Sequence, residues 1–298
     1  MVINTNQNAV EATSTLQKSH AAMNRSIARL STGSKIVQPS DDVAGLSNSE
    51  KMLAQGSRIE AARVNIQNAV SLTQTADGFL SSMNDVLNRM SELSVLAQDV
   101  TKSAGDQALY NTEFEKLKEH LRDVIGNGDN GTDGDPNWNM GSTDPSGSFN
   151  GIVLFGARAD MTIVVGTTGS QTMEVSEINL RRIGGAMSDL LWDNSVDGSQ
   201  PGLNMDSPSA ISKINSAIEQ LADERANVGA DLSRLGLVEA QLQVQEENLS
   251  AANSRIRDVD VAVETTRLAK NQILTEASTS MLQQANDLPR LALRLLNS

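Results

Sequence analysis

Branched aliphatic residues stand at every seventh position through the C-terminal third of this sequence. They are Ile214, Leu221, Val228, Leu235, Leu242, Leu249 and Ile256. A seven-residue apolar repeat is typical of a helix that packs along other helices. The helical pattern extends from about residue 208 to residue 287, which at 1.5 Å per residue would span roughly 120 Å if the helix were unbroken. A compact domain cannot hold such a helix, so the sequence predicts an elongated bundle or an assembly.

A second apolar stripe runs from about residue 43 to residue 100. Its columns contain Ile59, Ile66, Leu80 and Leu87; Ala62, Ala69, Ala76, Met83 and Met90; and Leu72, Phe79, Val86 and Leu93. Three apolar positions in every seven make a wider face than a two-stranded coiled coil needs. We therefore expect this helix to contact at least two neighbours, although Gly56 and Gly78 each cost about 1 kcal/mol in a helix interior.

Both ends of the chain carry helical patterns as well, over residues 8–32 and 268–296. The residues expected to form their assembly faces are Leu16, Met23, Ile27, Leu30, Leu274, Met281, Leu282 and Leu288. Pro289 is expected to end or kink the last helix. Each end alone buries too little surface to offset the entropy of ordering a helix of this length. We therefore expect both ends to be ordered only in an assembly.

The middle of the chain has a different pattern, with shorter elements between turns. A helix is expected over 107–125, followed by an exposed Gly- and Asp-rich loop that begins at Gly126. Short strands are expected at 152–155, 161–165 and 172–175, the last two forming a hairpin, and a short helix at 187–192. The seven aromatic residues all lie between residues 79 and 192, so rings are available only to this central part.

Composition excludes several classes of function. The 298 residues contain no Cys, which excludes disulfides and Cys-ligated metals, and the scarcity of rings favours aliphatic helix packing. The net charge of −13 argues against nucleic-acid binding, and no run of about 18 apolar residues predicts a membrane span. Residues 1–42 and 256–298 are close to neutral, whereas 126–206 hold 3 basic and 11 acidic residues. Neutral ends can pack against copies of themselves, and an acidic middle is suited to facing water.

No catalytic, cofactor-binding or metal-binding constellation is found. The two histidines, His20 and His120, belong to no zinc motif, and no serine lies in a nucleophile elbow. The acidic loop at 129–135 does not have the spacing of an EF-hand. We therefore expect neither an enzyme nor a cofactor.

Several ordered motifs resemble those of bacterial flagellins. Near the N-terminus they are RLSTGSKI at 29–36, PSDDVAGL at 39–46 and AVSLTQTADG at 69–78; FNG at 149–151 resembles the start of that family's hairpin. Near the C-terminus they are SRIRDVD at 254–260 and MLQQAN at 281–286, followed by Leu295 and Leu296. The resemblance covers nearly the whole chain except about 126–148 and 184–206.

The resemblance implies a mainly α fold and a structural subunit of the flagellar filament, the propeller for motility. Residues 1–42 and 256–298 would form a paired terminal coiled coil that lines the filament core. Residues 43–255 would form an outer layer, a helical bundle with a β-hairpin at about 149–180. About 180–206 is too short for a further outer domain, so a two-layer subunit is expected.

The resemblance also implies where the chain acts and with what. It would be exported unfolded through the flagellar type III apparatus to an extracellular filament, a route that would account for an N-terminus without a cleavable secretion signal. Its partners would be other copies of itself and the flagellar cap, junction and export chaperone proteins. A host innate immune receptor is a further partner, since Arg89, Leu93 and Glu113 match contact residues of some flagellins, although Asn88 and Ser91 depart from that pattern. The alternative is that Leu93 belongs to the core and Arg89 is a solvated charge.

Other classes of protein remain open at this point. A hook–filament junction protein shares the helical ends and the segment at 39–42, although the ending from Gln284 to Leu296 is closer to that of flagellins. A secreted coiled-coil binding module would explain the heptads but not the paired terminal motifs.

Overall fold

The computed structural model describes residues 6–126, 147–155, 161–181, 185–192, 203–205 and 207–296, the side chains of 288–296 excepted. The helices are α1 (Gln7–Thr32), α2 (Val43–Ala97), α3 (Ala104–Ile125), α4 (Ala186–Leu191), α5 (Ala210–Arg257) and α6 (Val261–Leu296). The strands are β1 (Ser148–Phe149), β2 (Ile152–Val153), β3 (Met161–Val164) and β4 (Thr172–Val175). The predicted mainly α fold with a small hairpin region is confirmed. The loop expected after Gly126 lies almost wholly outside the described residues.

The chain divides into two units, each described here by itself. Unit 1 contains Met1–Ser57 and Gln245–Ser298, and unit 2 contains Arg58–Val244. Unit 1 holds 11 basic and 11 acidic residues, whereas unit 2 holds 13 basic and 26 acidic residues. Unit 2 therefore carries the entire net charge of −13. The predicted boundaries at 42 and 256 refer to layers of a filament and stay a prediction.

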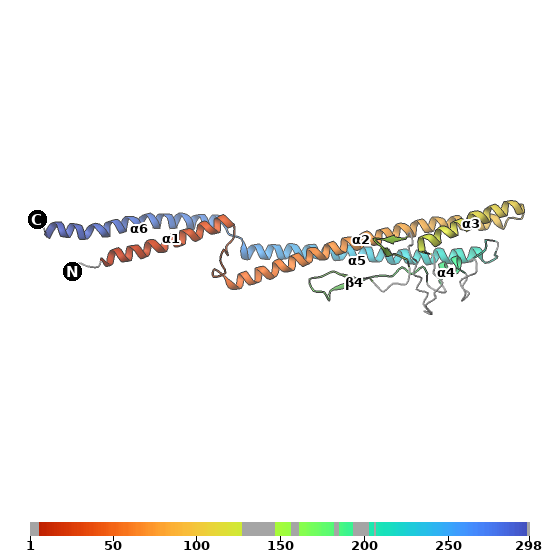
Figure 1. Cartoon of the computed structure of the whole chain (residues 1–298), viewed down its shortest axis with the longest axis horizontal. Helices are drawn as coiled ribbons and strands as arrows, with labels where there is room; N and C mark the ends of the chain where they lie inside the picture. The colour runs from red at the N-terminus through yellow and green to blue at the C-terminus, as the bar shows by residue number, and fades with distance from the viewer. Residues whose placement is uncertain are drawn as a thin grey trace. The chain divides into compact units, whose positions relative to one another are not determined.

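In unit 1, α1 and α6 lie side by side and run antiparallel (Figure 1). Asn6 begins α1 because its side-chain oxygen accepts a hydrogen bond from Ala9 N at 3.2 Å. The amide nitrogen of the same side chain donates to the carbonyl of Ala285 on α6 at 2.7 Å. The N-terminal end of α1 is thereby attached to the C-terminal part of α6.

The C-terminal helical pattern is interrupted, so residues 208–287 do not form one unbroken helix. The chain leaves α5 at Arg257 and enters α6 after Asp260, whose carboxylate accepts from Ala262 N at 2.9 Å and Val263 N at 3.1 Å. A bridge between Ser34 and Asp258 fixes the break, since Lys35 N donates to the Arg257 carbonyl and Val259 N to that of Gly33. Side-chain caps and this long-range pairing, which the heptad period does not reveal, end the helix.

Pro289 does not end α6, which continues to Leu296. Of the two expected effects, an end of the helix at this residue is therefore wrong, and a kink stays a prediction. A single proline removes one backbone hydrogen bond and can be accommodated inside a helix.

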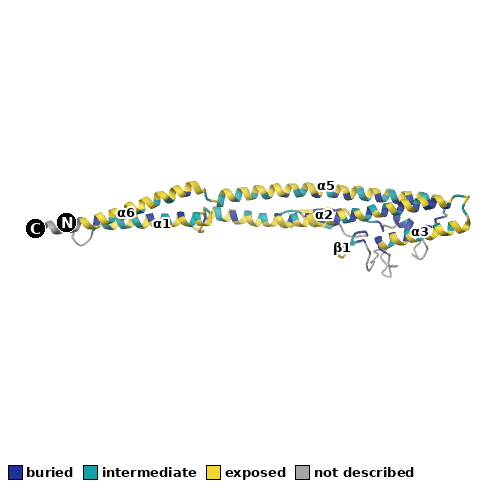
Figure 2. Cartoon of the chain, turned by 90° about the horizontal axis from the view of Figure 1, so that it is seen from above, coloured by how far each residue is buried: buried dark blue, intermediate teal, exposed yellow. Residues whose placement is uncertain are grey.

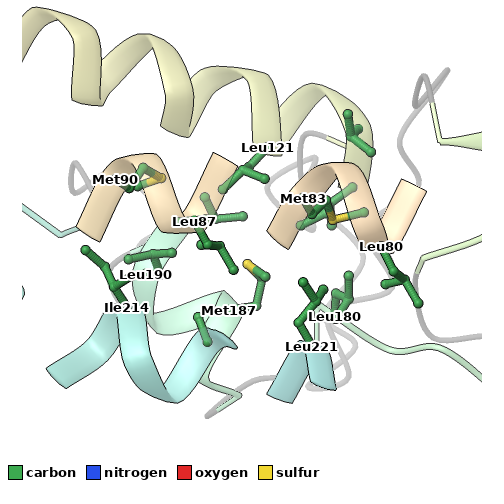
Figure 3. Close-up of a cluster of buried hydrophobic side chains, with 14 of the residues drawn as sticks. Leu80, Met83, Leu87, Met90, Leu121, Leu180, Met187, Leu190, Ile214 and Leu221 are labelled. Carbon is green, nitrogen blue, oxygen red and sulfur yellow. The ribbon is translucent and has the colours of Figure 1, made fainter. Parts of the chain in front are cut away.

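The core of unit 2 is aliphatic and is shared by helices α2 to α5. Figure 3 shows side chains of α2 facing side chains of α3, α5 and the segments around α4, and all of those labelled are fully or almost fully buried. They are Leu80, Met83, Leu87 and Met90 on α2, Leu121 on α3, Leu180, Met187 and Leu190 around α4, and Ile214 and Leu221 on α5. The prediction that the second stripe contacts at least two neighbours is confirmed by these packed helices. Two rings contribute at one end of the core, where Phe79 and Phe155 meet edge to face with centroids 6.0 Å apart.

Three basic side chains of unit 2, the buried Lys118 and Arg181 and the half-buried Arg122, donate hydrogen bonds to backbone carbonyls. The Lys118 ammonium, which is fully buried, donates to Glu115 at 2.7 Å and to the carbonyl of Leu203 at 3.2 Å. The Arg122 guanidinium donates to the carbonyl of Leu191, and that of Arg181 to the carbonyl of Ile125 at the end of α3. Burial lowers the pKa of both guanidiniums. These cations attach the segments around α4 to α3.

The strands form two separate antiparallel hairpins. In the first, Phe149 pairs with Ile152 across a two-residue turn, in which Asn150 and Gly151 have φ of 51° and 75°. Positive φ at both positions matches the twist of a hairpin and favours Asn-Gly. The second pairs β3 with β4, as predicted. The strand expected at 152–155 covers only 152–153. Beyond it, Leu154 N still donates to the carbonyl of Gly147, and Phe155 bridges to Ile178 instead of to β1.

Two glycines of unit 2 should respond to substitution in opposite directions. A Cβ at Gly236, inside α5, would meet no atom within 4 Å, whereas one at Gly147 would lie 2.3 Å from the carbonyl oxygen of Val124. Gly236→Ala should therefore raise the free energy of unfolding of unit 2 by about 1 kcal/mol, and Gly147→Ala should lower it. Urea unfolding followed by tryptophan fluorescence measures both, since both Trp residues belong to unit 2. A loss of stability in Gly236→Ala would contradict this assignment.

Candidate assembly surface

The seam between α1 and α6 follows a heptad spacing and mixes apolar with polar residues, and its most deeply buried positions are mostly polar. On α1 its half-buried or buried positions are Ala9, Ala12, Leu16, Ser19, Met23, Ser26 and Leu30; on α6 they are Glu264, Leu268, Asn271, Thr275, Ser278, Leu282 and Ala285. The most deeply buried polar members are Ser19, Ser26, Ser278 and Glu264. Small hydroxyl residues let two helices approach closely but bury little apolar surface, so these positions supply little hydrophobic stabilisation.

Large apolar side chains on the same two helices point away from the seam. Met281 is 66% exposed, Ile273 66%, Ile27 46% and Leu274 42%. Leu274, Ala277 and Met281 line a groove of about 420 Å³ together with Ala12 and Thr15 of α1. Figure 2 shows exposed and half-buried residues along most of this helix pair, in contrast to the buried stretches of α2 and α3. The described residues of this chain therefore do not bury these side chains, and only further protein surface could do so.

The predicted assembly residues fall into two groups. Leu16, Met23, Leu30 and Leu282 belong to the seam and are half-buried. Ile27, Leu274 and Met281 are exposed and available to a partner. Leu288 lies in α6, and its side chain is outside the described residues. The structure thus separates residues that pair the two helices from residues that can join the pair to another molecule.

The three residues expected to contact a receptor are not equivalent. Arg89 on α2 donates to both carboxylate oxygens of Glu113 on α3, at 2.8 and 3.2 Å, and to Glu92 at 3.0 Å. This hydrogen bond and the guanidinium charge hold the pKa of Glu113 below its ordinary value. Arg89 and Glu113 remain accessible, whereas Leu93 is fully buried. The Leu93 side chain belongs to the core of unit 2, as the alternative interpretation has it.

The sequence analysis did not identify the serines of the seam. It also did not identify a second groove, which is polar and lies between the C-terminal end of α1 and residues 37–41. Ser19 and Ser26 stand seven residues apart, beside the apolar column Leu16, Met23 and Leu30, and this spacing was the available signal. This polar groove forms because residues 37–41 fold back onto α1, and no periodic pattern in the sequence predicts such a loop. His20 and His120 are both exposed.

The described residues contain neither a cluster suited to a metal ion nor a helix suited to crossing a membrane. No group of three or more His, Asp or Glu side chains within the described ranges could hold a metal ion. None of the helices, over the residues described, is long and apolar enough to cross a membrane.

Comparison with known proteins agrees with the motifs at both ends. Residues 3–132 match the family model for the bacterial flagellin N-terminal helical region, and residues 211–296 match that for the C-terminal helical region. Flagellin FlaB2 of Treponema pallidum is 34% identical over 99% of this chain and 100% of its own length. The flagellin of Bacillus subtilis strain 168 is 32% identical with the same coverage. The crystal structure of Bacillus cereus flagellin matches with a TM-score of 0.45 at 24% identity, over 64% of this chain and 94% of that one.

The Treponema phagedenis flagellar filament 33 kDa core protein is 33% identical over 99% of this chain and 100% of its own length. Neither the junction-protein interpretation nor the binding-module interpretation gains support from these matches. The two terminal regions together account for most of the sequence, and their order along the chain is that of the relatives. This chain belongs to the bacterial flagellin family.

Proposed function

We propose that this protein is a structural subunit that polymerises with copies of itself into a bacterial flagellar filament, and that α1 and α6 carry the contacts. The single observation that supports this most is that the deepest positions of the seam are mostly polar, whereas Ile27, Ile273, Leu274 and Met281 on the same helix pair are exposed. A helix pair with no further partner would bury these large apolar side chains in its own seam. A pair that joins other copies would place them outside, because the hydrophobic effect then stabilises the assembly.

The distribution of charge supports the same arrangement. Unit 1 is neutral by residue count, whereas unit 2 carries −13. Copies of a neutral unit can pack densely without electrostatic repulsion, and copies of an acidic unit are better separated by water. We therefore infer that residues 1–42 and 256–298, which belong to unit 1, lie at the centre of the filament, that residues 43–255, which include all of unit 2, form the outer layer, and that there is no further outer domain.

The finer parts of the proposal concern export and partners. The chain would leave the cell unfolded through the flagellar type III apparatus, without a cleaved signal peptide, and meet the cap, junction and export chaperone proteins. It would have no enzymatic activity, because polymerisation alone accounts for the surfaces described. Contact with a host innate immune receptor would use Arg89 and Glu113, which are accessible, and not the buried side chain of Leu93.

Polar substitutions in the exposed apolar group test the proposal. Leu274→Gln combined with Met281→Gln should raise the critical concentration for polymerisation at least about tenfold, since each loses an apolar contact worth roughly 1 kcal/mol or more. Gln272→Ala, at an exposed polar position of α6, serves as the control. Sedimentation and electron microscopy of the purified chains measure the effect. An unchanged critical concentration in the double variant would exclude these side chains from the contact.

A further inference from the structure

We propose that a polar groove at the C-terminal end of α1 is an anion site that accepts a carboxylate from a second copy of this chain. The groove, of about 470 Å³, lies between α1 and the segment 37–41 that follows it. Asn24, Arg25, Arg29, Gln38, Ser40 and Asp41 supply its polar lining. We call it the arginine groove. The proposal rests on polymerisation as the function, and adds a specific contact to it.

The groove contains more positive than negative charge. Its one carboxylate, that of Asp41, is already occupied: one oxygen accepts from Val37 N at 3.2 Å and Gln38 N at 3.1 Å. The other oxygen lies 3.8 Å from Arg29 Nη2, which is too far for a hydrogen bond. The two backbone hydrogen bonds lower the pKa of Asp41, so this carboxylate is ionised at neutral pH. Even so, it balances only one of the two arginines.

The two guanidiniums are one helical turn apart and lack strong partners. Arg29 Nε is inaccessible to water and has no hydrogen-bond partner. Arg25 is exposed, and within the described residues no carboxylate lies within salt-bridge distance of it. Like charges at i and i+4 destabilise a helix, and an anion bound beside both of them offsets this repulsion. The planar fork of arginine fits a carboxylate, and two forks around one groove make an anion site.

The matching carboxylate lies at the other end of the same helix. Glu11 is exposed, forms no ion pair among the described residues, and lines the apolar groove with Leu274 and Met281. It stands 14 residues from Arg25 on α1, about 21 Å along the axis, so it cannot reach the arginine groove of its own chain. A second copy can supply it. The carboxylate of Glu11 near the N-terminal end of α1 in one copy would bind the arginine groove at the C-terminal end of α1 in the next. Such a head-to-tail contact repeats without closing when the symmetry is helical.

Removal of one guanidinium tests the site without disturbing Asp41. Arg25→Gln should raise the critical concentration for polymerisation roughly fivefold, the upper range for a solvent-accessible ion pair. Lys18→Gln, which removes a positive charge elsewhere on α1, should leave it within about twofold. Circular dichroism of the monomers checks that both variants keep their helices. If Arg25→Gln has the critical concentration of the parent chain, the proposal is overturned. If a chain that lacks residues 256–298 nevertheless fails to polymerise, the proposed function stands without the arginine groove.

A charge exchange identifies the occupant. Arg25→Glu and Glu11→Arg should each impair polymerisation, and the double variant should polymerise better than either single variant. Rescue of Arg25→Glu by Glu276→Arg instead would overturn the assignment to Glu11. Inorganic phosphate, compared with chloride at equal ionic strength, separates a protein carboxylate from a free anion. Phosphate should compete with the carboxylate and raise the critical concentration of the parent chain more than that of Arg25→Gln. If phosphate instead lowers the critical concentration of the parent chain and leaves that of Arg25→Gln unchanged, a free anion fills the groove and the second copy does not.

Discussion

Deletion of residues 256–298 should yield a soluble subunit that forms no filaments at concentrations where the full chain polymerises completely. The deletion removes all of α6, and with it one side of the seam with α1 and the exposed Ile273, Leu274 and Met281. Helix α1 then loses the helix that packs along it. A single helix of this length gains too little from its own hydrogen bonds to stay ordered in water. Both contacts within the pair and contacts between pairs are therefore lost.

Electron microscopy and sedimentation of the truncated chain measure this effect directly. The fold of unit 2 serves as the internal control, because residues 58–244 are untouched and should unfold in urea at the same midpoint as in the full chain. Hydrogen exchange should show that residues 7–32 lose protection in the truncated chain. Filaments formed by the truncated chain would remove α6 from the assembly contact.

Leu87→Ala should destabilise unit 2 by about 2–5 kcal/mol, the range for truncating a fully buried leucine. Leu87 has no exposed surface and lies in the cluster shared by α2, α3, α4 and α5 (Figure 3). The cavity left by three lost carbon atoms cannot be refilled, because helices on several sides hold their positions. A loss of this size is a large part of the total stability of a domain.

The matched control is Leu109→Ala on α3, where the side chain is 71% exposed. This substitution should change the free energy of unfolding by less than about 0.5 kcal/mol. Urea unfolding monitored by tryptophan fluorescence reports on unit 2, since both Trp residues lie in its sequence. Equal effects of the two substitutions would contradict the assignment of Leu87 to a packed core.

The long helices could be predicted because their signal is local and periodic. The column from Ile214 to Leu242 is buried in the structure, and the stripe of α2 is buried wherever it meets a neighbour. The break after Arg257 could not be predicted from the same period. It depends on a bridge to Ser34, more than two hundred residues away in the sequence, and on a cap at Asp260 that is shorter than one heptad.

The candidate site was predicted in part, for the same reason. Apolar columns located the faces of α1 and α6, but periodicity alone could not tell that Leu16 lies in the seam while Met281 points outward. The buried cations were missed because Lys118 and Arg181 stand in polar stretches, and their burial depends on carbonyls supplied by other segments. Leu93 shows the opposite case: its heptad position predicted burial, whereas the family resemblance suggested a contact surface.

A helical reconstruction of the assembled filament by electron cryo-microscopy tests the central claim most directly. The claim is that α1 and α6 leave their large apolar side chains outside their own seam because neighbouring copies cover them. The reconstruction should show Ile27, Leu274 and Met281 buried against adjacent subunits and the acidic unit 2 on the outer surface. A map in which these three side chains face solvent or an open channel, while unit 2 forms the centre, would contradict the account.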